Sequence, residues 1–249
     1  MPSPLAAFAS AVAGLLDRSR AGFDRLDSGR QALTLGVVVL VTFASAFGIV
    51  ALGSVFDATI DREVSVENPE RPSEATCETF GDDDESVFAD RCDQPAIVDI
   101  DVGTELQRTT GEYVGYGLLG VPIWWALFAL VLHGGTRLAG GTGSLRDSFA
   151  IAAWAIAVEV VRLAAGVAVV WYALSTTTVG GATIGAVTDE LIAAISATRG
   201  PLLLASAVVI AIQWVVVVGG LEAYHDLDRG VAGVVVGIFG AFGLLLAAV

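Results

Sequence analysis

Long apolar stretches separated by short polar segments run through this chain. Five stretches of about twenty residues carry almost no charge, which matches the roughly 30 Å hydrocarbon core of a bilayer. We therefore expect five membrane-spanning helices, at residues 31–53, 113–132, 148–174, 201–221 and 231–249. The pattern predicts an all-α membrane protein.

The segment 54–112, between the first two predicted spans, has a different character. It holds 17 of the 27 acidic residues, including the run Asp82–Glu85. Residues 63–67 and 97–102 alternate apolar and polar side chains, as strands do. We expect a small acidic extracytoplasmic lobe with a short antiparallel β pairing. The acid run lacks the spaced D-x-D-x-D-G pattern of a calcium loop, so a solvated acidic face is the favoured interpretation.

The first thirty residues place apolar side chains at helical spacing and interleave Arg with Asp. Because the basic residues follow the apolar run, we expect a retained amphipathic helix in the membrane interface rather than a secretory signal. A frayed terminus is an equal alternative for residues 1–10. The chain thus divides into a cytoplasmic segment 1–30, a first span 31–53, the lobe 54–112 and a four-helix membrane domain 113–249.

Composition and charge refine this picture. Hydrophobic residues make up 55% of the chain and charged residues 16%, against about 25% charged in a typical soluble domain. All 13 basic residues are Arg and the net charge is −14, which indicates a salt-adapted organism and argues against a nucleic-acid partner. Arg is denser on the N-terminal side of the predicted topology, so we expect a cell-membrane protein with a cytoplasmic N-terminus and an extracytoplasmic C-terminus.

The only two cysteines, Cys77 and Cys92, both fall in the predicted lobe. Outside the cytoplasm a disulfide can persist, and closing a loop of about fifteen residues could contribute ~3 kcal/mol. A zinc site would need two more ligands, and the lobe contains no histidine. We predict a disulfide, with two free thiols as the alternative.

Glu159 and Arg162 stand in the third predicted span. A charge at mid-bilayer costs at least ~2.5 kcal/mol, so such residues normally face the protein interior and are paired. Their spacing of three puts them on one helix face, where they can neutralise each other. A structural pair is favoured over a proton or ion pathway.

A glycine-rich hinge at residues 133–144 joins the second and third predicted spans. Its candidate hinge and packing positions are His133, Gly134, Gly140, Gly141, Gly143 and Ser144. A Walker loop needs a lysine, which this chain lacks, and a dinucleotide fingerprint follows a strand rather than a membrane helix. We interpret the glycines as a tight turn between packed helices.

The two histidines, His133 and His225, are expected at the cytoplasmic ends of spans. Glu222 and His225 resemble half of a carboxylate metal motif, but the other half is missing, so capping of helix ends is the default interpretation. No nucleophile motif surrounds any serine. The sequence therefore indicates no enzyme, no metal site, no cofactor and no small-molecule substrate.

The central stretch resembles the Yip domain family. The apolar run from Trp125 ends in His133, and it is followed by Arg137-Leu138 and then by Gly140-Gly141-Thr142-Gly143-Ser144. Residues 214–230 are similar to the family's fourth span and the connector that follows it. The resemblance covers roughly residues 113–249. The family usually has a proline near the position of Val158, and the acidic lobe has no counterpart in it.

The resemblance implies five spans and a role without catalysis. Eukaryotic members are non-enzymatic membrane proteins associated with Rab GTPases and vesicle traffic, and we expect this chain on the prokaryotic branch. The implied role is membrane organisation or adaptor function, with membrane lipids, other membrane proteins or a second copy as partners. The alternative is a small ion or solute translocator that uses Glu159 and Arg162.

Overall fold

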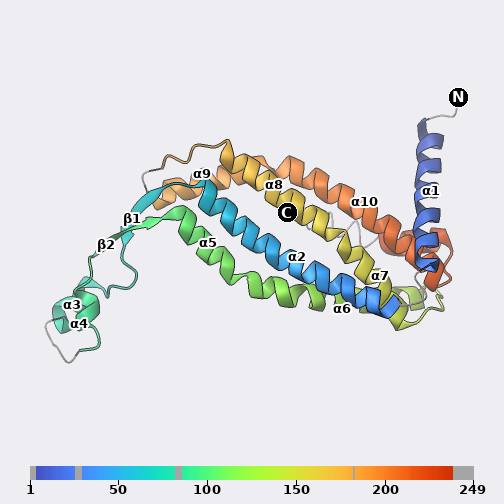
Figure 1. Ribbon diagram of the computed structural model, residues 1–249, viewed down its shortest axis with the longest axis horizontal. Helices are drawn as coiled ribbons and strands as arrows, with labels where there is room; N and C mark the ends of the chain where they lie inside the picture. The colour runs from blue at the N-terminus through green and yellow to red at the C-terminus, as the bar shows by residue number, and fades with distance from the viewer. Residues whose placement is uncertain (1–3, 26–29, 82–85, 182, 238–249) are drawn as a thin grey trace.

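The computed structural model describes residues 4–25, 30–81, 86–181 and 183–237, and helices dominate it (Figure 1). The elements are α1 (Pro4–Asp24), α2 (Arg30–Thr59), β1 (Glu63–Glu67), α3 (Glu74–Phe80), α4 (Ala89–Cys92), β2 (Ile97–Asp101), α5 (Val102–Glu112), α6 (Val114–Leu138), α7 (Leu145–Ala157), α8 (Glu159–Ser175), α9 (Ile184–Ala197) and α10 (Arg199–Tyr224). A further helical segment covers residues 229–237.

Four helical stretches within the described residues are long and apolar enough to cross a membrane. They are Gln31–Thr59, Val102–Leu138, Leu145–Ser175 and Arg199–Tyr224, and they run alongside one another in Figure 1. They correspond to the first four predicted spans. Of the fifth, residues 231–237 are helical and residues 238–249 lie outside the described part of the chain. Five spans therefore stay a prediction.

The segment between the first two spans is shorter than the predicted range 54–112. α2 continues to Thr59, and α5 already begins at Val102. Asp101 starts α5 by accepting a hydrogen bond from the Thr104 N–H at 2.7 Å, which is the usual role of an N-cap carboxylate. A single turn residue, Tyr113, separates α5 from α6. The apolar run alone could not reveal α5, because that helix is largely polar.

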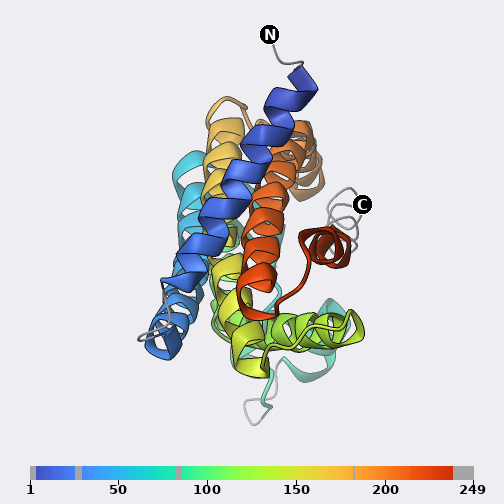
Figure 2. The same cartoon turned by 90° about the vertical axis from the view of Figure 1, so that its right-hand side faces the viewer.

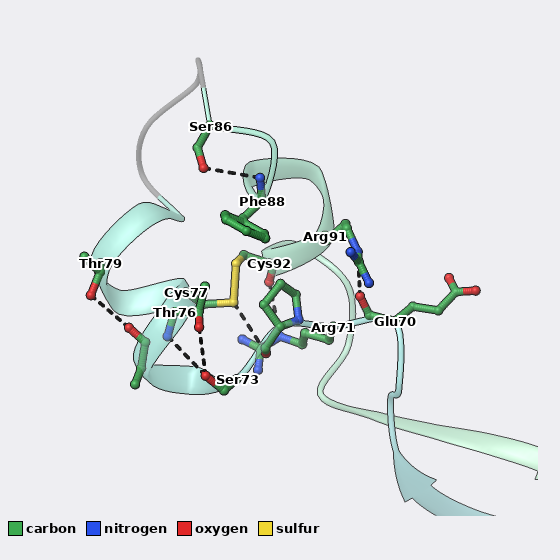
Figure 3. The surroundings of a disulfide bond; sticks show 12 residues. Glu70, Arg71, Ser73, Thr76, Cys77, Thr79, Ser86, Phe88, Arg91 and Cys92 are labelled. Atoms are coloured by element: carbon green, nitrogen blue, oxygen red, sulfur yellow. Dashed lines mark hydrogen bonds between the residues drawn. A yellow bond between two sulfur atoms is a disulfide. The ribbon is translucent and has the colours of Figure 1, made fainter.

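The predicted β pairing is present. β1 and β2 are antiparallel, with Glu63 opposite Asp101 and Glu67 opposite Ile97. Beyond this ribbon, α3 and α4 form a small head at the end of the molecule farthest from α1 (Figure 1). A disulfide joins Cys77 of α3 to Cys92 of α4, with their Cα atoms 5.4 Å apart (Figure 3).

The base of the ribbon is fixed to the ends of the helices. Ile60, Val64 and Val102 are buried in one cluster with Leu174 and Val187 from α8 and α9. In addition, the Arg62 Nε donates to the Gly181 carbonyl at 2.9 Å. The base of the ribbon is thus packed against the bundle and hydrogen-bonded to it.

At the opposite end, α1 lies across α10 (Figure 2). Leu16 and Phe23 of α1 are 3% and 5% exposed and belong to a core cluster with Leu132, Ile151 and Leu221. The sequence predicts that these apolar residues face the membrane interface. These two residues pack against protein instead, whereas Leu15 of the same helix is 50% exposed, so the interfacial position of α1 stays a prediction.

Candidate functional site

Three polar clusters interrupt the apolar packing of the helices. We call them the histidine cluster (His133, Ser148 and His225), the Arg229 cluster (Asp17, Glu222 and Arg229) and the mid-span cluster (Glu159, Arg162 and Gln213). The first two lie at the end where α1 crosses α10, and the third lies near the middle of the stretch Leu145–Ser175.

The turn that leads into the histidine cluster is shorter than the predicted hinge. α6 continues to Leu138, so His133 and Gly134 are helical and the hinge prediction is wrong for them. Gly134 is exposed and a Cβ atom there would meet nothing within 4 Å, so no close contact calls for a turn at this position. Within the turn, Gly140 has φ +85°, a conformation that favours glycine.

The last residue of this turn caps the N-terminus of α7. Ser144 is the N-cap and forms a capping box with Asp147. The Asp147 carboxylate accepts from the Ser144 N–H at 2.7 Å. Such reciprocal bonds satisfy two backbone donors that the first helical turn leaves free. The cap fixes the direction in which α7, and with it Ser148, enters the bundle.

The Ser148 hydroxyl stands between two imidazoles. Its Oγ lies 3.1 Å from His225 Nε2 and 3.4 Å from His133 Nδ1. A hydroxyl can donate one hydrogen bond while it accepts another, so Ser148 can join the two histidines. The cluster therefore links α6, α7 and the end of α10. The sequence analysis did not identify Ser148, because no motif marks it.

His225 is completely buried. Burial lowers the pKa of His225, and the nearby His133 and Arg137 act in the same direction, whereas Asp147 opposes them. The neutral imidazole is therefore favoured. Its Nδ1 has no partner among the described residues.

The cluster does not provide a metal-ligand set. In the described part of the chain, His, Cys, Asp and Glu never come together in groups of three or more that could hold a metal ion. The paired histidines contact a serine hydroxyl, which is a poor ligand for the metals that imidazole suits.

The Arg229 cluster attaches α1 to the rest of the bundle. Arg229 donates from Nε to Glu222 Oε1 at 2.8 Å and from Nη2 to Asp17 Oδ1 at 2.7 Å. The Glu222 side chain is only 6% exposed. Tyr224 adds a second tie, because its hydroxyl donates to the Phe23 carbonyl at 2.9 Å. Glu222, considered above as half of a metal motif, pairs with an arginine.

In the mid-span cluster, Arg162 Nη2 lies 2.6 Å from Glu159 Oε2. The two side chains are 47% and 30% exposed, respectively. The sequence predicts that the pair faces the protein interior, and the structure corrects this for Arg162, which points out of the described bundle. Other faces of α7 and α8 pack against α2 and α10.

Gln213 of α10 completes the cluster where α7 gives way to α8. The helix is interrupted at Val158 although no proline is present. The Gln213 Nε2 donates to the Ala155 carbonyl at 3.0 Å and to Glu159 Oε1 at 2.7 Å. A side chain that inserts into the helix hydrogen bonds is a recognised cause of a kink. Gln213 thus satisfies at this break a carbonyl that could find no water in the bilayer.

An apolar groove of about 450 Å³ lies between α2 and α8. Its lining includes Ala44, Gly48 and Ala51 of α2 and Val167 and Trp171 of α8. The groove offers contact area without polar groups, which suits lipid chains.

Comparison with known proteins identifies a family for this chain. The model of the Yip1 domain matches residues 13–249. No curated protein and no solved structure matches the chain. The matched range contains all three polar clusters, and it extends well beyond the resemblance noted at residues 113–249.

Proposed function

Because the chain belongs to the Yip1 domain family, we propose that this multi-pass membrane protein has no catalytic activity and organises the membrane or acts as an adaptor. The partners we propose are lipids and other membrane proteins. The role rests chiefly on how the polar side chains of the bundle are used.

Each polar cluster connects elements that are distant in the sequence. Ser148 joins two histidines, Arg229 joins α1 to α10, and Gln213 joins α10 to the break between α7 and α8. Groups employed in this way fix the relative positions of helices. This use of polar groups is the observation that carries the proposal, because an adaptor needs a stable frame.

We propose that the head made of α3 and α4 contacts a partner protein outside the cell membrane. It stands at the far end of the β ribbon (Figure 1). With the N-terminus in the cytoplasm and the C-terminus outside, the head and its disulfide would lie in the extracytoplasmic space.

Chemical cross-linking in native membranes followed by mass spectrometry tests the adaptor role. We expect a small, reproducible set of membrane proteins linked to the head or to α1. Replacement of residues 68–96 by the two-residue turn Asn-Gly, which can connect the ribbon strands as a hairpin, should remove the partners that are linked through the head. A chain that yields no reproducible partner protein under several linkers would contradict the proposal.

One observation favours a second candidate function. The exposed charges of Glu159 and Arg162 near mid-span suit a small ion or solute translocator. Reconstitution into liposomes with a proton- or sodium-sensitive dye distinguishes the two functions. Flux that Glu159→Gln abolishes would support translocation and contradict the adaptor proposal.

A further inference from the structure

The mid-span cluster leaves a charged side chain facing out of the described bundle. Arg162 lies near the middle of the 31-residue stretch Leu145–Ser175, and its side chain is 47% exposed. A guanidinium that faces the hydrocarbon core is strongly unfavourable. Arg162 therefore requires a group that covers it.

Side chains of the same chain accept hydrogen bonds from only some of the N–H donors of the Arg162 guanidinium. Among the described residues, the contact of Nη2 with Glu159 is the one found for it. Glu159 accepts from Gln213 through its other oxygen and is still 30% exposed. A guanidinium has five N–H donors, so most of them need acceptors from elsewhere.

The remaining predicted span offers no suitable side chain. Residues 231–249 consist only of apolar residues and glycine. They contain no carboxylate, amide or hydroxyl that could accept from Arg162. The acceptors must come from another molecule.

We propose that a second copy of this chain covers Arg162, with α8 packed against α8 about a two-fold axis perpendicular to the membrane. Such an axis keeps both copies at one depth, so each Arg162 meets the partner's Glu159. The axial offset between them is three residues, and the Arg162 side chain already bridges that offset within its own helix. The surface is self-complementary, as a two-fold interface requires.

Gly166 is the position where the two backbones can approach. It lies four residues after Arg162, hence on the same side of α8. A Cβ atom built at Gly166 meets nothing within 4 Å. Small residues at such open positions permit close helix contacts in membranes. The proposed dimer does not depend on the adaptor function.

Oxidative cross-linking in native membranes tests the interface. The Cys77–Cys92 disulfide leaves no free cysteine in the native chain, so one can be introduced at will. We expect Gly166→Cys to give a dimer on a non-reducing gel. Val208→Cys is the matched control, because it is 51% exposed on antiparallel α10 at a similar depth. It should give several-fold less dimer.

The charges supply a second test in the Gly166→Cys background. Arg162→Glu and Glu159→Arg should each cross-link poorly with themselves, because like charges would meet. Co-expressed with tags of different size, these two variants should form the mixed dimer preferentially. The double variant Glu159→Arg/Arg162→Glu keeps both charges and should cross-link as well as its parent, which shows that the exchanged side chains are tolerated.

Three outcomes would overturn the proposal. Equal cross-linking at Gly166 and Val208 would indicate random collision. If mixed dimers were no more frequent than self dimers, the proposed ion pairs between Arg162 of one copy and Glu159 of the other would be contradicted. Labelling of Gly166→Cys by a water-soluble maleimide in intact membranes would place water, rather than a second copy, beside Arg162.

Discussion

Gly143 lies directly against the imidazole of His225. A Cβ atom built on Gly143 would come within 2.5 Å of His225 Nδ1 and of the Tyr224 carbonyl oxygen. The Thr142 N–H also donates to the His225 carbonyl at 3.0 Å. The turn between α6 and α7 is therefore held against the end of α10, and the contact needs a residue without a side chain.

We expect Gly143→Ala to destabilise the protein by about 1–3 kcal/mol, which is the usual cost of inserting a methyl group where there is no space. Thermal unfolding in detergent measures the loss. Gly134→Ala is the control, because Gly134 is exposed in α6 and a Cβ there meets nothing within 4 Å. It should leave the unfolding temperature unchanged or slightly higher. Equal losses in the two variants would contradict this account.

The buried His225 predicts a loss of stability in mild acid. Its pKa lies below the ordinary value of 6.5 because burial disfavours the charged form. Below pH 6.5 the unfolded chain binds a proton at this histidine more readily than the folded chain does. The contribution of His225 to the free energy of unfolding is therefore fully present above pH 6.5 and falls as the pH drops below it. The slope can reach about 1.4 kcal/mol per pH unit for one group.

Unfolding temperatures between pH 7.5 and 5 check this prediction. His225→Gln should be less stable at pH 7.5 yet should lose less on acidification than the native chain. His133→Gln is a useful comparison, since the chain has only two histidines. An unchanged pH dependence in His225→Gln would show that other groups cause the acid sensitivity.

We expect the two carboxylate partners of Arg229 to contribute unequally to stability. Arg229→Gln leaves the almost buried Glu222 carboxylate without its cation, which should cost about 1–3 kcal/mol. Asp17 is 69% exposed, so Asp17→Asn should cost at most about 1 kcal/mol. Both variants should loosen α1, which faster trypsin cleavage within α1 would reveal. Equal losses from the two substitutions would contradict the pairing described here.

The apolar runs and the alternating segments predicted the four described spans and the β pairing. They succeeded because burial in lipid and pairing in a ribbon each impose a period that a single sequence displays. The limits of α5 and α6 were missed for opposite reasons. α5 is polar and resembled part of the lobe, whereas α6 carries glycines that resembled a hinge yet remain helical through His133 and Gly134.

The site was predicted less completely, since its contacts come from the tertiary arrangement. The spacing of Glu159 and Arg162 predicts their pairing, but nothing local indicates which way Arg162 faces. Ser148 and Gln213 matter only because other helices place histidines and the Ala155 carbonyl beside them. A lone polar residue in an apolar span, such as Gln213, is the signal that could have been used.

The disulfide and the side of the membrane on which the head lies can be tested together. None of the residues of α3 and α4 is buried, so the head has no core and depends on Cys77–Cys92 to hold its helices together (Figure 3). Arg71 Nε and Arg91 Nε add hydrogen bonds to the Cys92 and Glu70 carbonyls at 3.2 and 2.8 Å. The first of these bonds is partly buried and the second is exposed, and single hydrogen bonds of this kind contribute only modestly to stability.

Intact cells are treated with a membrane-impermeant maleimide, with and without prior reduction by an impermeant phosphine. We expect the native chain to be labelled only after reduction, because both thiols are occupied until then and the head lies outside. Cys77→Ser frees Cys92 and should be labelled without reduction, which separates topology from bonding. Labelling of the unreduced native chain would show that the two thiols are not joined in a disulfide. A Cys77→Ser chain that is labelled only after cell lysis would place the head in the cytoplasm.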